Sequence, residues 1–149
     1  MAKSSFLDKS TKLDFLGDYE IRESKEKNSS AAPEFFGYLF SIRDKAHLAH
    51  LKVSGPGAFS AHMALGDFYS GILEITDELI EVYQGMYGII DNITIPGSTY
   101  MEPVGLLDSC RTYIQTNRMK VCDESHFQNI MDNLVALIDR TLYKLENLK

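Results

Sequence analysis

The chain has 149 residues and a mass of 16.8 kDa, with 44% hydrophobic and 24% charged residues. A chain of this length forms one compact domain that buries about two-thirds of its unfolded surface, which excludes a disordered acidic protein. The 15 Lys and Arg are outnumbered by 21 Asp and Glu, and the net charge of −6 argues against binding to DNA or to an anionic membrane.

Residues 1–32 are expected to form a partly ordered arm before the domain. The segment SKEKNSSAA is polar and small, and acidic and basic residues balance over the arm as a whole. Its apolar side chains lack helical spacing but suit docking on a neighbouring surface; they are Phe6, Leu7, Leu13, Phe15, Leu16 and Tyr19. A simple tail and a partner-binding arm remain equally open. The N-terminus lacks the apolar core of a signal peptide, so we expect a cytoplasmic protein.

From Pro33 onward, apolar residues recur at alternating spacings of three and four, which predicts amphipathic helices. The first is predicted from about Pro33 to Val53, and Ser54-Gly55-Pro56-Gly57 ends it. The second keeps the same spacing from Ala58 to Met86 and would extend over about 43 Å.

A connector of unusual length follows, because residues 89–104 contain two prolines and several β-branched residues. A shorter third helix is predicted from about Gly105 to Met119. Asp123 or Ser125 suits the N-cap of a fourth helix, whose apolar face continues almost to the end of the chain.

The lengths of the connections predict how these helices are arranged. A short turn, a long connection that runs the length of the bundle and a second short turn describe an all-α four-helix bundle with one crossover, the ferritin-like topology. No stretch approaches the ~20 apolar residues of a membrane span. Cys110 and Cys122 lack the spacing of a redox or zinc site, so both are expected to be reduced thiols in the core or at its boundary.

The sequence contains no glycine-rich phosphate loop, no Gly-x-Ser-x-Gly elbow and no His-Glu-x-x-His zinc helix. Acidic and imidazole side chains instead gather in the first two helices; they are Asp44, His47, His50, His62, Asp67, Glu74, Asp77, Glu78 and Glu81. Oxygen and imidazole ligands suit iron, manganese and zinc. Because Glu-x-x-His is absent, a di-iron centre within one chain is disfavoured.

The most specific pattern consists of His50, His62, Asp77 and Glu81. His62 precedes Asp77 by fifteen residues, which cover about 22 Å of helix. Metal ligands converge to about 2 Å from an ion, so the histidines cannot share one with the carboxylates of their own chain. An antiparallel two-fold dimer would bring the histidines of one subunit against the acidic pair of the other, in two equivalent sites.

The run KAHLAHLKVSGPGAFSAHMALGDFYSGILEITDELIEVYQG resembles the Dps-like miniferritins, in which two histidines twelve apart precede an acidic pair four apart. The resemblance implies a homo-oligomeric shell, a dodecamer built from two-fold dimers, that stores iron and protects against oxidative damage. It also implies a mono-iron or di-iron ferroxidase site at each dyad, using peroxide or dioxygen, with His50 and His62 from one chain and Asp77 and Glu81 from the other. The closing NLVALIDRTLYKLENL resembles small ferritin-like proteins of bacteriophage genomes.

Departures from the family pattern leave an alternative open. Gly66 occupies the position of an acidic ligand, and Asp67 is rotated by about 100° from it. The alternative is a ferritin-like structural or interaction protein that has lost the iron chemistry. DNA compaction ranks below both, because the chain is acidic and has no lysine-rich tail. His47 is expected at the surface or an interface, and Tyr69 as a packed aromatic.

Overall fold

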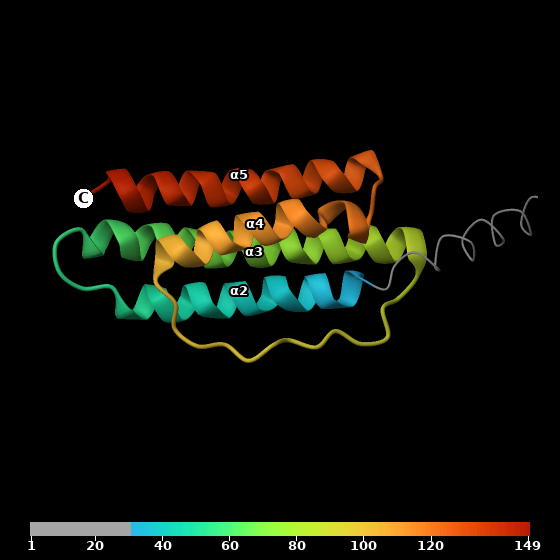
Figure 1. Cartoon of the computed structure of the whole chain (residues 1–149), viewed down its shortest axis with the longest axis horizontal. Coiled ribbons are helices and arrows are strands. Elements are labelled where there is room, and N and C mark those ends of the chain that lie inside the picture. The colour runs from blue at the N-terminus through green and yellow to red at the C-terminus, as the bar shows by residue number, and fades with distance from the viewer. Residues whose placement is uncertain (1–30) are drawn as a thin grey trace, which may run out of the picture.

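The computed structural model describes residues 31–149, and the predictions for residues 1–30 lie outside this range. The described chain forms four helices and no strand; they are α2 (Ala32–Lys52), α3 (Ala58–Tyr87), α4 (Pro103–Val121) and α5 (Ser125–Asn147) (Figure 1). The predicted all-α four-helix bundle is confirmed. None of these helices combines the length and the apolar character needed to cross a membrane.

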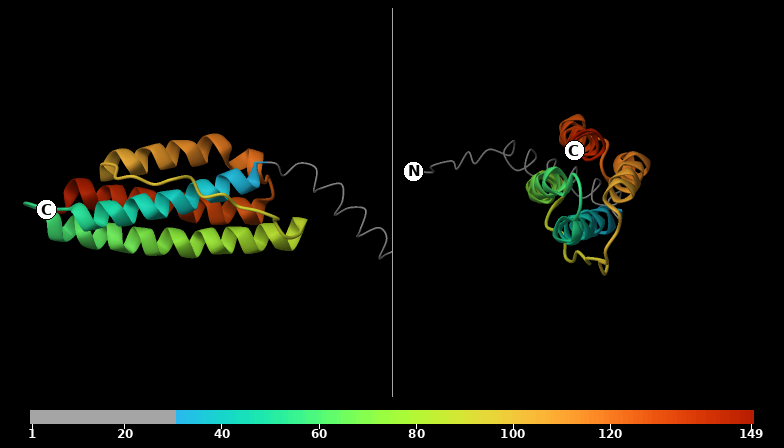
Figure 2. Two further views of the ribbon diagram at one scale, coloured as in Figure 1. Left: turned by 90° about the horizontal axis from the view of Figure 1, so that it is seen from below. Right: turned by 90° about the vertical axis from the view of Figure 1, so that its left-hand side faces the viewer.

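The four helices form a square bundle in which neighbours run antiparallel (Figures 1 and 2). Helices α2 and α5 each pack against both α3 and α4. The two diagonal pairs of the square are α2 with α5 and α3 with α4. The connection between α3 and α4 runs back along α2 for most of the length of the bundle (Figure 1). This is the one-crossover arrangement that the connection lengths predict.

The apolar stripes of the four helices meet in one core. Its largest fully buried side chains are Phe35, Phe36, Leu39 and Ile42 of α2, Phe68, Leu65, Ile72 and Leu79 of α3, Leu106, Leu107 and Ile114 of α4, and Phe127 of α5. Tyr83 joins the aromatic part of this core, with its ring 5.7 Å from the Phe36 ring in an edge-to-face contact. Burial of these side chains supplies the main driving force for folding.

The crossover is held against α2 by a close approach at Gly37. A Cβ atom at this position would overlap the backbone carbonyl oxygen of Thr94, so a residue with a side chain does not fit. The neighbouring Ile93 packs on the core, and the Ser98 hydroxyl donates to the carbonyl oxygen of Ser41 over 3.3 Å. The extended backbone therefore lies directly on the helix.

Helix α4 begins at Pro103, two residues before the predicted start at Gly105. Glu102 is the N-cap, and its carboxylate accepts hydrogen bonds from the N–H groups of Val104 and Gly105 at 3.1 and 2.8 Å. These bonds satisfy two of the donors that a helix start leaves free. Proline at the first helical position costs no hydrogen bond, because a backbone N–H at this position has no partner within the helix.

The prediction that Asp123 or Ser125 caps the fourth helix is wrong. The N-cap of α5 is Glu124, and its side chain makes no capping hydrogen bond. Instead Arg118 and Gln128 close the turn between α4 and α5: the Arg118 guanidinium donates to the Gln128 carbonyl oxygen at 2.9 Å, and the Gln128 amide donates to the Cys122 carbonyl oxygen at 2.5 Å. Side chains from both helices thus replace the local cap.

Both cysteines are free thiols in the core, as predicted. Cys110 is fully buried, and this burial raises the pKa of its thiol to about 12. Burial also raises the pKa values of the Tyr38 and Tyr87 hydroxyls above their ordinary range. The folded chain thus holds these protons to a higher pH than the unfolded chain does.

We expect the free energy of unfolding to fall as the pH rises above about 9. In the unfolded chain the Cys110 thiol ionises near its ordinary pKa of 9.0, whereas in the folded chain it stays protonated to about pH 12. The stabilisation is therefore complete below the first value and lost toward the second. Denaturant titrations across this range should show a steeper fall for the wild type than for Cys110→Ala. Equal slopes would contradict the assignment.

Candidate metal centre

Two of the predicted ligands, His50 and His62, lie against each other where α2 ends and α3 begins. Their rings stack with centroids 3.7 Å apart and planes 26° apart. Nδ1 of His50 donates to the carbonyl oxygen of His62 at 2.8 Å, and Nδ1 of His62 donates to the carbonyl oxygen of His50 at 3.2 Å. The two histidines are therefore held by a reciprocal pair of hydrogen bonds.

The turn between the helices makes this pairing possible. Gly55 and Gly57 have φ values of 82° and 77°, a left-handed conformation that residues with a Cβ rarely adopt. The N–H of Ala58 donates to the carbonyl oxygen of Gly55 at 3.1 Å and closes the turn. The chain thus reverses at once, and two histidines twelve residues apart come face to face.

The hydrogen bonds also determine which ring nitrogens of His50 and His62 carry protons. A carbonyl oxygen only accepts, so each Nδ1 must be protonated, and Nε2 of a neutral ring then keeps a free lone pair. Within residues 31–149, no hydrogen bond to either Nε2 atom is present. A backbone-bonded Nδ1–H with an open Nε2 is the arrangement typical of metal-binding histidines.

Gly66 lies beside the ring of His50. A Cβ atom at this position would come within 3.4 Å of Cε1 and 3.6 Å of Nδ1 of His50, which is ordinary van der Waals contact. Asp67 does not replace the missing carboxylate, because its side chain forms an ion pair with Lys144 of α5 at 3.3 Å. The histidine half of the candidate centre therefore contains imidazoles and no acidic ligand from position 66.

His47 and Tyr69 extend this aromatic cluster. The ring of His47 stacks on that of Tyr69 at 4.5 Å, and the ring of His50 meets Tyr69 edge-on at 5.3 Å. Tyr69 is thus packed, as predicted, and His47 lies 6.0 Å from His50. In the sequence, the spacing of three between His47 and His50 and of seven between His62 and Tyr69 indicates that each pair shares a helix face.

The predicted acidic pair, Asp77 and Glu81, lies farther along α3 and is exposed. Asp77 follows His62 by fifteen positions, or about 22 Å of helix, so the fold does not bring the histidines and carboxylates of one chain together. Residues 31–149 contain no group of three or more His, Cys, Asp or Glu side chains placed to hold a metal ion. Glu74 and Glu78 are also exposed, so this half of α3 is strongly acidic.

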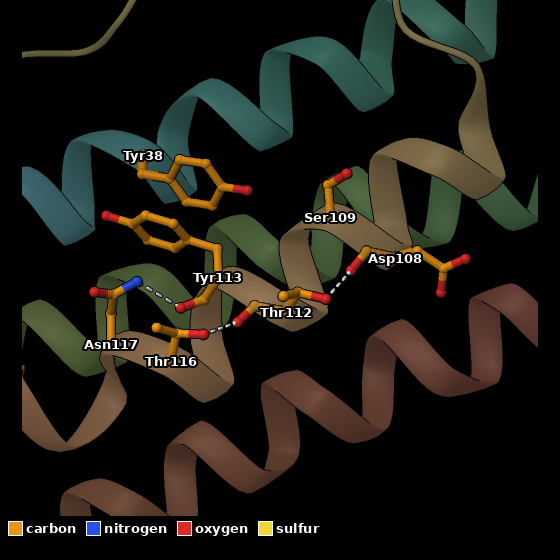
Figure 3. A pocket seen from close by; sticks show the side chains of 7 residues that line it. All are labelled: Tyr38, Asp108, Ser109, Thr112, Tyr113, Thr116 and Asn117. Atoms are coloured by element: carbon orange, nitrogen blue, oxygen red, sulfur yellow. Dashed lines mark hydrogen bonds between the residues drawn. The ribbon is translucent and has the colours of Figure 1, made fainter.

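A groove of about 520 Å³ lies elsewhere, between α2 and α4 (Figure 3). Tyr38 and Tyr113 stack there with ring centroids 3.7 Å apart. The hydroxyls of Thr112 and Thr116 donate to carbonyl oxygens one turn earlier in their own helix, and Asp108 pairs with Arg111 at 2.8 Å. These groups are engaged within the fold, so the groove offers no catalytic arrangement comparable to the histidine pair.

No curated protein and no solved structure matches the chain. A family of unknown function (DUF5856) matches residues 50–145, which is well over half of the chain. The matched span begins at His50 and includes His62, Asp77 and Glu81. The chain is therefore a member of this family of unknown function (DUF5856).

Proposed function

We propose that the protein is a Dps-like ferritin that binds and oxidises Fe(II) at sites shared by two subunits. The observation that carries this proposal is the reciprocal hydrogen bonding of His50 and His62, which leaves the Nε2 lone pair of each ring open. Imidazole and carboxylate are ligands that iron accepts. The ferric product would be stored within a homo-oligomeric shell, for which the resemblance implies a dodecamer.

The positions of the ligands along α3 support a shared site. In an antiparallel pair of α3 helices, a two-fold axis midway between Gly71 and Ile72 puts His62 opposite Glu81 of the partner subunit. The same axis puts Gly66, which lies beside the ring of His50, opposite Asp77 of the partner subunit. One register therefore serves both histidines, and the symmetry creates two equivalent sites.

The exposed side chains near the histidines supply apolar surface for such a dimer. Leu51, Phe59 and Met63 are 66%, 79% and 50% exposed, although all three are large and apolar. They lie at the end of α2 and the start of α3, next to the histidine pair. Covering them against a second subunit would contribute about 25 cal/mol for each Å² of apolar surface removed from water.

In this proposal the side chains bind iron and offset its charge. Each Fe(II) ion gives up one electron, and one molecule of peroxide takes up two electrons and two protons to form two water molecules. The carboxylates of Asp77 and Glu81 offset the additional positive charge of Fe(III). The exposed Glu74 and Glu78 raise the local concentration of Fe(II). Consumption of peroxide without free Fe(II) would limit hydroxyl radical formation.

Stopped-flow absorbance of ferric iron tests the proposal. Purified protein should oxidise Fe(II) faster than buffer alone, with peroxide or dioxygen as oxidant, and should keep the ferric product soluble. The yield of hydroxyl radicals from Fe(II) and peroxide should fall in parallel. Oxidation no faster than in buffer, together with precipitated iron, would contradict the proposed activity.

We expect Gly66→Asp to bind Fe(II) more tightly than the wild type. The position accepts a Cβ at van der Waals distance from His50, so the new carboxylate would lie beside an imidazole ligand. A further anionic oxygen ligand should raise the affinity by about tenfold or more. Anaerobic calorimetry compares it with Gly66→Asn, which has the same shape and no charge. Equal affinities for all three proteins would contradict the assignment of this position to the metal site.

The second candidate is a ferritin-like structural or interaction protein without iron chemistry. It is favoured by Gly66, which offers His50 no carboxylate, and by the ion pair of Asp67 with Lys144. Such a protein would form the same oligomer in the presence of a chelator and would oxidise Fe(II) no faster than buffer. The stopped-flow experiment therefore separates the two functions.

A further inference from the structure

The end of the bundle opposite the α2–α3 turn contains a cavity of about 400 Å³ that no part of residues 31–149 fills. It is lined by Pro33 at the start of α2, by Tyr83 and Tyr87 near the end of α3, and by residues 88–92 at the start of the crossover. Figure 2 shows this end, where α2 begins and the crossover leaves α3. The cavity thus lies where the described chain begins.

Ile89 stands out among the residues that line this cavity. Its side chain is 80% exposed, the highest value among the large apolar side chains of the described residues. The surrounding backbone is nevertheless held in place, because the N–H of Ile90 donates to the side-chain oxygen of Gln84 at 3.1 Å. Gly88, with φ of 97°, ends the helix in a conformation that favours glycine. An exposed apolar side chain at the edge of a cavity is suited to contact with another apolar group.

We propose that Leu13, Phe15 and Leu16 of the same chain dock in this cavity and cover Ile89. These apolar residues are close together in the sequence, and Leu16 precedes Pro33 by seventeen positions. At up to about 3.3 Å per residue, this length spans at most about 56 Å, so the group reaches the cavity without a second copy of the chain. The tether makes the contact intramolecular, with an effective concentration in the millimolar range.

Acidic side chains lie around the cavity. Asp91 belongs to the cavity lining, and Asp123 and Glu124 lie close enough to Tyr87 for their charges to help raise the pKa of its hydroxyl. In the arm, Lys9 and Lys12 precede Leu13. Asp8, Asp14 and Asp18 offset these two lysines, so the choice of this segment rests on its apolar side chains and on the length of the tether.

Limited proteolysis of the full chain tests the proposal. Trypsin cuts after Lys12, directly before the docking group, and after Arg22, between this group and the bundle. Ile89→Ser should accelerate cleavage after Lys12 by about tenfold relative to cleavage after Arg22, which corresponds to about 1.4 kcal/mol of docking. Adding Leu13→Ser and Leu16→Ser to Ile89→Ser should not accelerate this cleavage further, because the arm substitutions and the cavity substitution remove the same contact.

Ile95→Ser is the matched control, because Ile95 is 48% exposed on the same crossover but does not line the cavity. Its cleavage pattern should equal that of the wild type. An unchanged rate after Lys12 in Ile89→Ser would overturn the proposal. A second result would also overturn it. The Ile89→Ser protein has an intact arm, and the Leu13→Ser/Leu16→Ser protein has an intact cavity; if adding the second protein protects the arm of the first from cleavage, the arm docks on another chain.

Discussion

Glu81→Gln is expected to reduce the initial rate of Fe(II) oxidation by more than about 100-fold and to leave the fold intact. The substitution keeps the shape of the side chain and removes the anionic charge of one of the two carboxylates proposed as iron ligands. Loss of an outer partner of a metal ligand already costs about 10- to 100-fold, and loss of a ligand should cost more. Glu81 is exposed, so no core contact is removed. Stopped-flow absorbance measures the rate.

Glu78→Gln is the matched control for this prediction. Glu78 is an exposed acid on the same helix, but it has no place in the register that pairs histidines with carboxylates. Its loss should lower the rate only by the small amount expected from a weaker field around the site. Equal rates for Glu81→Gln and the wild type would contradict the role of Glu81 as a ligand. Equal losses of oxidation rate in Glu78→Gln and Glu81→Gln would mean that Glu81 acts only by attracting cations to the site.

Gly37→Ala is expected to destabilise the protein by about 3 kcal/mol, which lowers Tm by roughly 10 °C. The new Cβ would overlap the carbonyl oxygen of Thr94, and neither of these backbones can move without loss of packing. Relief requires the crossover to lift from α2, which breaks the Ser98–Ser41 hydrogen bond and uncovers the core beneath Ile93. Thermal unfolding followed by circular dichroism measures the effect.

Gly85→Ala is the control, because a Cβ atom at that position in α3 would meet nothing within 4 Å. Alanine at an open position within a helix should stabilise the protein by about 0.5–1 kcal/mol. The same chemical change should therefore have opposite signs at the two positions. Equal Tm values for Gly37→Ala and the wild type would contradict the close approach of the crossover.

Most of the fold could be predicted because it follows from local patterns. The spacing of apolar residues defines each helix, and the lengths of the three connections then leave few ways to arrange them. The errors lie at the helix ends. The carboxylate of Glu102 starts α4 before its apolar stripe begins, and the start of α5 depends on Arg118 and Gln128, which belong to different helices. A cap formed across helices has no local sequence signal.

The close approach at Gly37 shows a second limit of sequence-based prediction. Its glycine lies within a helix, where nothing in the sequence indicates that a segment almost sixty residues later lies on it. The contact depends on the path of the crossover, which is decided by the packing of the whole bundle.

For the candidate site, the sequence suggested which residues to consider but not their local arrangement. The sequence analysis assigned His50 and His62 of one chain to the same site, and in the structure their rings stack across the turn. The exchange of hydrogen bonds with each other's carbonyl oxygen depends on backbone positions that a spacing does not define. The pairing with Asp77 and Glu81 stays a prediction, because it requires a second chain.

Complementation between two inactive variants tests the shared site most directly. One variant carries His50→Ala and His62→Ala, the other carries Asp77→Ala and Glu81→Ala, and the two are co-expressed with different tags so that mixed dimers can be purified. Each mixed dimer would contain one intact site and one site without ligands, so a shell in which the two variants pair at random should oxidise Fe(II) at about a quarter of the wild-type rate. Mixed dimers as inactive as either parent would contradict a site shared between subunits.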